Sequence, residues 1–266
     1  LFDSLISKKF KEPLSDSYLK TLKSLSGELR RELVSKGKIS LEFINSIPLR
    51  YNNNTSYNTT RRHLNVLVNY LYENNFPIER SKLKSRKQEE TLHKPIEDVK
   101  ELLTKVKAFN EDLYLCCLLT YGCLLRPHQE IRLLKWEDFT IDLSHIRLSG
   151  NQVKSKRNRI VPVSPKIRET LKRKEGYLNI FTGLKQPYSR SYFIQLWRRF
   201  KRLNPEVDKE ITLYSFRHSG AIEIFKRTGS ITKLQKAMGH SSMTVSLTYL
   251  RGLEVAELQE EDMPMV

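Results

Sequence analysis

Hydrophobic residues recur at helical intervals through the first part of the chain. In the first 80 residues the apolar positions lie three and four apart, at Leu22, Leu25, Leu29 and Leu33 and again at Leu64, Leu67, Val68 and Leu71. This spacing puts one apolar face on each of two helices. Gly37 is a natural end for the first of them, and a shorter element begins at Ser40. The pattern predicts a helical domain over residues 1–80.

The periodicity is lost in the charged stretch ERSKLKSRKQEETLHK, which runs from Glu79 to Lys94. A charged stretch without an apolar face is typical of an interdomain linker. We therefore predict a linker at residues 81–94, with the domain boundary near residue 90.

Residues 95–266 combine helical and strand patterns. Strand alternation is seen in FTIDLSHIRLSG and NRIVPV, which are joined by a loop rich in Lys and Arg. Helices are expected just after Pro127 and at 96–108, 111–124, 165–174, 190–203, 214–227, 231–238 and 242–250. The predicted fold class is mainly α with a small antiparallel β-sheet, an α+β arrangement.

The final predicted helix contains a tyrosine that the core does not require. Gly239 is expected to end the preceding helix and Ser241 or Ser242 to cap the next. The buried stripe of that helix is expected at Met243, Leu247 and Leu250. At 100° per residue, Tyr249 points about 200° away from Leu247, so its phenol is available for chemistry.

Net charge changes the expected partner of the chain. Its 266 residues carry 47 Lys+Arg against 30 Asp+Glu, which gives a formal charge of +17. A globular protein this basic usually binds a polyanion, although a basic surface can also serve solubility alone.

The cysteines indicate a reduced interior. All three lie in the apolar run LYLCCLLTYGCLL, without the paired spacing of a zinc site. This run is also shorter than the roughly 20 residues that span a bilayer. No signal peptide is visible, so a cytoplasmic protein that binds no membrane is expected.

Two basic motifs could contact an anion. Arg126 precedes Pro127, which suits the first turn of a helix, and Glu130 could hold the guanidinium or cap that helix. A surface Arg126–Glu130 pair is the structural alternative. The inter-strand loop carries a basic group that could equally be a solvated hairpin tip: Lys154, Lys156, Arg157 and Arg159. Only Lys in this group can give up a proton, because a guanidinium keeps its own.

Two further segments place charge beside apolar residues. Tyr214, Arg217 and His218 share one turn at the start of a largely apolar helix, where an unpaired charge would be costly to bury. Arg217 could nevertheless be purely structural. The helix at 190–203 displays Arg198, Arg199 and Arg202 among aromatic residues that we interpret as a core stripe.

Taken in order, these motifs resemble the catalytic domain of the tyrosine recombinase (phage integrase) family over residues 96–250. The family pattern is an Arg box, a Lys in a strand hairpin, a His-x-x-Arg box, a Gly-His pair and a Tyr nine residues beyond that His. Its counterparts here are Arg126, Lys154, Arg217, His240 and Tyr249. Residues 1–80 resemble, more weakly, the helical core-binding domain of the family.

The chain departs from the family pattern at two positions. Tyr214 stands where the His of His-x-x-Arg is usual, and a phenol can donate to a phosphate but is no acid near neutrality. The Arg box also has one residue more than usual between Arg126 and Glu130. By the resemblance, Tyr214 is a catalytic candidate, and Glu130 and His218 support the site.

The resemblance implies phosphoryl transfer to Tyr249 without metal, ATP or another cofactor. Arg126 and Arg217 would bind the phosphate with His240, and Lys154 would protonate the leaving 5′-oxygen. The implied partner is a double-stranded DNA recombination site, held in a C-shaped clamp, with Lys156, Arg157, Arg159, Arg198, Arg199 and Arg202 as DNA contacts. The implied assembly is a homo-tetramer on two DNA sites, formed by exchange of a C-terminal helix, with a monomer allowed off DNA.

Two other functions fit much of the same pattern. A DNA-binding regulator could share the charge and fold without using the site. A type IB topoisomerase would share the phosphotyrosine step but relax DNA as a monomer. The full Arg, Lys, Arg, His, Tyr set favours an enzyme over a regulator, and the two-segment layout favours a recombinase.

Overall fold

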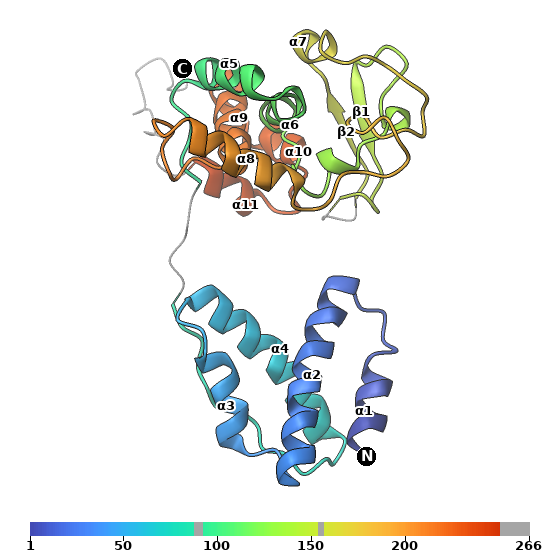
Figure 1. The fold of residues 1–266 in the computed structure, drawn as a ribbon, viewed down its shortest axis with the longest axis vertical. Helices are drawn as coiled ribbons and strands as arrows, with labels where there is room; N and C mark the ends of the chain where they lie inside the picture. The colour runs from blue at the N-terminus through green and yellow to red at the C-terminus, as the bar shows by residue number, and fades with distance from the viewer. Residues whose placement is uncertain (88–92, 154–156, 251–266) are drawn as a thin grey trace, which may run out of the picture. The chain divides into compact units, whose positions relative to one another are not determined.

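The computed structural model describes residues 1–87, 93–153 and 157–250. The chain divides into two compact units, Leu1–Glu90 and Thr91–Val266 (Figure 1). Each unit has its own apolar core.

The first unit is helical throughout its described core. Its helices are α1 (Phe2–Lys9), α2 (Asp16–Lys36), α3 (Leu41–Leu49) and α4 (Asn54–Glu73). The two predicted apolar faces meet in this core, where Leu22 and Leu29 of α2 and Leu64 and Leu71 of α4 are buried. Gly37 ends α2 in the left-handed region at φ 70°. The predicted helices of this unit are therefore present.

The predicted linker begins too early. Within residues 81–87, Arg86 exchanges two hydrogen bonds with the Asn58 side chain, at 2.7 and 2.8 Å. The Arg61 guanidinium and the Tyr57 hydroxyl donate to the Leu83 and Lys84 carbonyls at 2.6 and 3.0 Å. These side chains of α4 satisfy the backbone of an extended segment, which makes residues 81–87 part of the first unit rather than a linker.

The second unit carries the mixed elements predicted from the sequence. Its helices are α5 (Val99–Phe109), α6 (Glu111–Gly122), α7 (Pro165–Arg168), α8 (Tyr192–Leu203), α9 (Leu213–Thr228), α10 (Ile231–Met238) and α11 (Met243–Leu247). Short 3₁₀ turns are η1 (Ile131–Leu133), η2 (Trp136–Asp138) and η3 (Thr248–Leu250). The described strands are β1 (His145–Leu148) and β2 (Arg159–Pro162). The fold class predicted from sequence, mainly α with a small antiparallel sheet, is confirmed.

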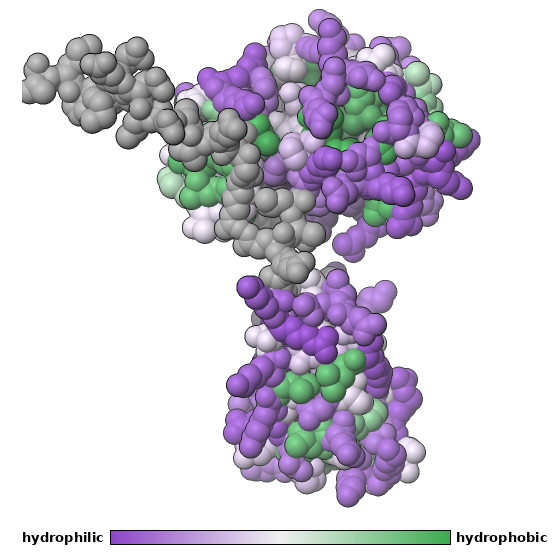
Figure 2. All heavy atoms as spheres, turned by 90° about the vertical axis from the view of Figure 1, so that its left-hand side faces the viewer, coloured by the Kyte–Doolittle hydropathy of each residue, from purple (hydrophilic) through white to green (hydrophobic). Residues whose placement is uncertain are grey.

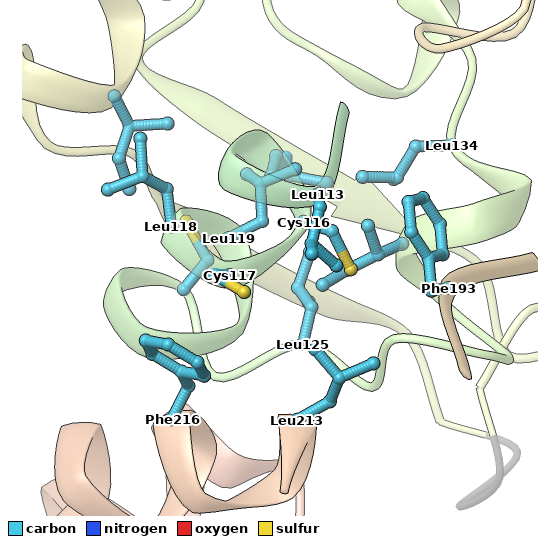
Figure 3. Close-up of a cluster of buried hydrophobic side chains, with 14 of the residues drawn as sticks. Leu113, Cys116, Cys117, Leu118, Leu119, Leu125, Leu134, Phe193, Leu213 and Phe216 are labelled. Carbon is cyan, nitrogen blue, oxygen red and sulfur yellow. The ribbon is translucent and has the colours of Figure 1, made fainter. Parts of the chain in front are cut away.

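Helix α6 lies at the centre of the second unit. Leu113, Cys116 and Leu119 are fully buried, and Phe193 of α8 and Phe216 of α9 lie in the same cluster (Figure 3). All three cysteines are free and buried, as the apolar run predicted. Burial raises the pKa of each thiol, so these sulfurs remain protonated packing groups.

The two strands pair antiparallel, with His145 opposite Pro162 and Leu148 opposite Arg159. Their side chains alternate across the sheet, so Ile146 of β1 and Val161 of β2 face the core. The same alternation turns Arg159 inward and leaves Ile160 67% exposed. The β2 strand therefore buries the guanidinium of Arg159 in the interior of the second unit.

Three local predictions are wrong. Residues 127–130 form a turn that leads into η1 instead of a helix, because the Glu130 carboxylate folds back onto the Arg126 backbone N–H at 2.9 Å. The helix expected at 165–174 ends at Arg168, since few apolar residues follow to anchor it. In α11, Met243 and Leu247 are about half exposed and Ser246 faces inward, because its hydroxyl hydrogen-bonds the His240 ring at 3.0 Å.

Candidate active site

Residues from four separate parts of the second unit meet around one cavity of about 630 Å³. Its walls come from the turn after α6, the segment before α8, the start of α9 and the chain from Gly239 onward. The lining residues are Arg126, His128, Gln129, Arg190, Ile194, Tyr214, Gly239, His240, Ser241, Val245 and Tyr249. The predicted Arg126, Tyr214, His240 and Tyr249 are thus brought together.

Arg126 is held by a buried carboxylate. Glu130 accepts from the Arg126 Nη1 at 2.6 Å through Oε1, and from the Arg126 backbone N–H through Oε2. Arg159 approaches the same Oε2 at 3.5 Å and donates to the Cys123 and Leu124 carbonyls at 3.1 Å each. The Glu130 side chain is fully buried, so two guanidiniums neutralise one interior carboxylate. The extra residue of the Arg box still allows Glu130 to position Arg126.

Arg217 is fully buried in the first turns of α9. Its Nη2 donates to the Met238 carbonyl at 2.9 Å, while Nε and Nη1 have no hydrogen-bond partner among residues 1–87, 93–153 and 157–250. Burial and the neighbouring Arg126 cation lower the pKa of Arg217. Two unpaired N–H groups beside a second cation make this a strong site for an anion.

His240 follows the left-handed Gly239, whose φ of 67° ends α10. Its Nδ1 is hydrogen-bonded to the Ser246 hydroxyl, which fixes the orientation of the ring. Burial, followed by the Arg217, Arg126 and Arg159 cations, lowers the pKa of His240 to about 4. The imidazole is therefore neutral near pH 7 and can present Nε2 to the cavity as a hydrogen-bond donor.

Tyr249 lies in 3₁₀ turn η3 and lines the cavity of its own chain. Its ring is 5.5 Å from the His218 ring and 5.4 Å from the His240 ring, measured between centroids. His218 is buried, with a relative exposure of 3%, and this burial lowers the pKa of its imidazole. The imidazole of His218 thus supports the phenol from the core side as a neutral ring.

Tyr214 occupies the second position of α9, between two imidazoles. His93 stacks on its ring at 5.2 Å, and the His128 ring centroid is 6.3 Å away. Burial raises the pKa of Tyr214, although the Arg126 and Arg217 cations oppose the shift. The phenol stays protonated near neutrality, so it can donate to a phosphate but cannot replace a histidine in proton transfer.

Comparison with known proteins decides the family. The sequence model of the phage integrase family matches residues 95–254, which is more than half of the chain. This chain belongs to that family. The tyrosine recombinase XerA of Pyrococcus furiosus is 27% identical over 182 residues, which cover 65% of this chain and 62% of XerA. The match thus spans less than two thirds of that relative.

Solved structures of other phage integrase family proteins share the fold. The Tn1549 transposon integrase, in complex with a circular intermediate DNA, superposes with a TM-score of 0.67 at 16% identity, covering 93% of this chain and 94% of that one. A lambda integrase dimer bound to a COC′ core site gives a TM-score of 0.74 at 17% identity, covering 97% and 79%. A lambda integrase tetramer bound to a Holliday junction gives 0.72 at 16% identity, covering 91% and 77%.

The predicted DNA contacts are dispersed in the structure. Lys154 and Lys156 lie outside the described residues. Arg159 was expected at an exposed hairpin tip, but its side chain is buried, with a relative exposure of 7%, and contacts Glu130. The prediction that Arg159 contacts DNA is therefore wrong. Arg157 is exposed and lines a groove of about 790 Å³ beside His240.

The three arginines of α8 that were predicted to contact DNA are exposed but do not line the cavity: Arg198, Arg199 and Arg202. Arg198 and Arg202 border a separate hollow, and Arg199 lies over the Phe109 ring at 6.0 Å. The aromatics of this helix are buried as predicted, with Phe193, Trp197 and Phe200 in the core. Figure 2 shows a largely hydrophilic face on both units, with small apolar patches.

Sequence reasoning missed three site residues. His128 and Arg190 line the cavity, and His93 stacks on Tyr214. The extra residue in the Arg box was a signal for His128, because an insertion beside a site residue brings a further side chain into the site. Arg190 was expected only as one of the basic residues of the helix at 190–203, and not in the site. For His93 the sequence held no signal, since it comes from a loop whose position depends on packing.

Within residues 1–87, 93–153 and 157–250, His, Cys, Asp and Glu side chains form no group of three or more that could hold a metal ion. No helix in these ranges is both long and apolar enough to cross a membrane.

Proposed function

We propose that this chain is a site-specific DNA recombinase that cleaves and rejoins DNA through Tyr249. One observation carries the proposal: Arg126, His240 and Tyr249 line one cavity, and the buried guanidinium of Arg217, close enough to lower the pKa of His240, has two nitrogens without a hydrogen-bond partner among the described residues. An isolated guanidinium in the interior is costly, which favours a site completed by a bound anion. The scissile phosphodiester supplies that anion.

The reaction begins when the Tyr249 oxygen attacks phosphorus and its phenol proton leaves to solvent. An O–P bond forms to Tyr249 while the bond from phosphorus to the 5′-oxygen breaks, which gives a 3′-phosphotyrosyl bond and a 5′-hydroxyl. Arg126 and Arg217 stabilise the charge on the non-bridging oxygens, and His240 Nε2 donates to the same group. Lys154, outside the described residues, is the proposed donor to the leaving oxygen.

Tyr214 contributes a hydrogen bond rather than a proton. Its raised pKa keeps the phenol neutral, and Tyr214 lines the same cavity as Arg126 and His240. Because the covalent intermediate stores the energy of the broken bond, religation to another strand needs neither metal nor ATP. The same chemistry run in reverse completes strand exchange.

We also propose that the protein acts on DNA as a homo-tetramer built by exchange of its C-terminal segment. The DNA-bound dimer and tetramer of lambda integrase support assembly on DNA for a related fold. The exchanged segment would contain Leu253, Val255 and Leu258, which lie outside the described residues. Mobile-element transfer is supported by the similarity to the Tn1549 integrase fold.

The test uses a nicked suicide duplex built from DNA that flanks the coding region. Wild-type protein should form a covalent adduct that survives a denaturing gel, and Tyr249→Phe should form none. Tyr177→Phe, which removes an exposed phenol outside the cavity, is the matched control and should retain the adduct. An adduct formed by Tyr249→Phe would disprove the assignment of the nucleophile.

A two-site assay then separates recombination from relaxation of supercoils. Exchange of flanking DNA between two cognate duplexes supports a recombinase. Relaxation of a supercoiled plasmid without exchange would instead support the topoisomerase alternative.

A further inference from the structure

The cavity has a second positively charged wall that the proposed chemistry does not use. Arg190 and His128 both line the cavity, and Arg132 lies beside them. Neither Arg190 nor Arg132 forms an ion pair with a carboxylate among residues 1–87, 93–153 and 157–250. No hydrogen bond from these residues reaches either ring nitrogen of His128, and its Nδ1 is buried without a partner. The positive charge of this wall is therefore not neutralised by a carboxylate of any residue that the structure describes.

Arg132 joins the two segments that form this wall. Its Nε donates to the His128 carbonyl at 3.2 Å, and its Nη1 donates to the Tyr188 carbonyl at 2.6 Å. Tyr188 lies two residues before Arg190, and its own hydroxyl donates to Asp112 at 2.8 Å. The guanidinium thus fixes His128 and the Arg190 segment together and adds its own charge.

The cations of the cavity fall into two separate groups. His240 is influenced by Arg217, Arg126 and Arg159, which lower its pKa. His128 is influenced by burial first and then by Arg190 and Arg132, which lower its pKa as well. The guanidinium groups that lower the pKa of His128 are therefore different from those that lower the pKa of His240. Tyr214 lies between them, with its ring 6.3 Å from that of His128.

We propose that Arg190, His128 and Arg132 form a second phosphate subsite, which binds a phosphodiester next to the scissile one. The ligand class follows from the chemistry, since guanidiniums beside an imidazole recognise a phosphate monoanion. The inference rests on the proposed function for the identity of the bound DNA. Arg190 supplies the permanent charge, and His128 supplies a hydrogen bond that strengthens when the ring is protonated.

The subsite makes DNA binding dependent on pH. The groups that face His128 are Arg132 of η1, Arg190 before α8, Tyr214 of α9, and Arg126, His240 and Tyr249 across the cavity. In the free protein burial, followed by the Arg190 and Arg132 cations, lowers the pKa of His128. A phosphodiester in contact with the ring favours the imidazolium, so binding raises the pKa of His128 and takes up a proton. DNA binding consequently becomes tighter as the pH falls through the pKa that His128 has in the DNA complex.

The first test measures salt-dependent binding of the full chain to a short duplex of arbitrary sequence. Arg190→Gln should reduce the slope of log K against log salt by about 0.9, the value for one phosphate contact. Arg227→Gln is the matched control, because it removes the same charge from an exposed side chain outside the cavity. The control should leave the slope unchanged.

The second test follows the imidazole directly. His128 is assigned in the NMR spectrum by comparison with His128→Gln, and its pKa is measured with and without the same duplex. The pKa should rise on binding in wild type and in Arg227→Gln, and should rise less in Arg190→Gln. Equal slopes for the two arginine variants, or an imidazole pKa that the duplex leaves unchanged, would overturn the subsite.

These results are independent of the test of the nucleophile. If wild type forms the Tyr249 adduct while Arg190→Gln binds like Arg227→Gln, the subsite is wrong and the proposed function stands. If wild type forms no adduct, the proposed function fails, and the slope and the imidazole titration still decide whether this wall binds phosphate.

Discussion

At the scale of single residues, the proposed site depends on Glu130, a buried carboxylate that does not line the cavity. Glu130 is fully buried and accepts hydrogen bonds from Arg126, with Arg159 at 3.5 Å. A buried carboxylate between two guanidiniums neutralises part of their charge and fixes their orientation. Arg126 can therefore present its remaining N–H groups to a phosphate with little loss of side-chain entropy.

Removal of the Glu130 charge should be costly. Glu130→Gln leaves two guanidiniums without a counter-charge, one of them buried, so we expect the free energy of unfolding to fall by about 3 kcal/mol. Trp136 and Trp197, the two tryptophans of the chain, both lie in the second unit, so denaturation followed by their fluorescence reports this unit. Glu137→Gln, which breaks an exposed pair with Lys135, should change stability by less than about 0.5 kcal/mol. Equal effects of the two substitutions would contradict the role of Glu130.

At the scale of elements, the proposed catalytic side chains of α9 are positioned by the close packing of this helix on α6. Gly220 makes the approach possible: a Cβ at this position would lie 2.1 Å from the Tyr121 carbonyl oxygen. The same helix carries Tyr214, Arg217 and His218 in its first two turns. Any displacement of α9 from α6 would therefore move these side chains relative to Arg126 and Tyr249.

Gly220→Ala tests this packing. The added methyl group meets backbone rather than a flexible side chain, so α9 must shift, and stability should fall by about 2 kcal/mol or more. Formation of the Tyr249 adduct should fall as well, because the guanidinium of Arg217 moves with the helix. Gly176→Ala is the control, since its Cβ would meet Glu137 at an ordinary contact distance of 3.5 Å. A stable, fully active Gly220→Ala protein would show that the contact does not position the site.

At the scale of the whole molecule, charge is the dominant property. The chain carries a formal charge of +17, and basic side chains such as Arg157, Arg198 and Arg202 are exposed on the second unit. Uncompensated surface charge of this sign attracts a polyanion from a distance and is screened by salt.

Binding to duplex DNA of arbitrary sequence should therefore weaken steeply with salt. Contacts to only four phosphates give a slope of log K near −3.6, which is a loss of about 150-fold between about 50 and 200 mM salt. The measurement is fluorescence anisotropy with a labelled duplex over this range. A nearly flat dependence would show that the charge serves solubility and not DNA binding.

Much of the architecture could be read from local patterns. Period-3.6 apolar faces predicted α2, α4 and α8 to α10, and Gly37 and Gly239 predicted helix ends that the structure confirms at φ 70° and 67°. The ordered motifs predicted that Arg126, Tyr214, His240 and Tyr249 share a site, and these residues do line one cavity. Such features depend on residues near one another in sequence or on a motif set that few sequences match by chance.

The remaining features depend on contacts between distant segments. Strand alternation turns the charged Arg159 into the core and the apolar Ile160 toward solvent, which is the reverse of what their polarity predicts. The buried position of Arg159 is stable because Glu130, from a distant turn, supplies a counter-charge. A hydrogen bond to His240 placed Ser246, rather than Met243, against the body of the molecule. His128 and Arg190 met on one cavity wall because Arg132 donates to both of their segments.

The sequence by itself determined the helical periodicity, the helix ends, the net charge and the order of the site motifs. The tertiary structure decided which polar side chains are buried and which pairs face one cavity. The physical reason is that a charge can enter the interior only where another segment supplies its partner, and no local pattern records that partner.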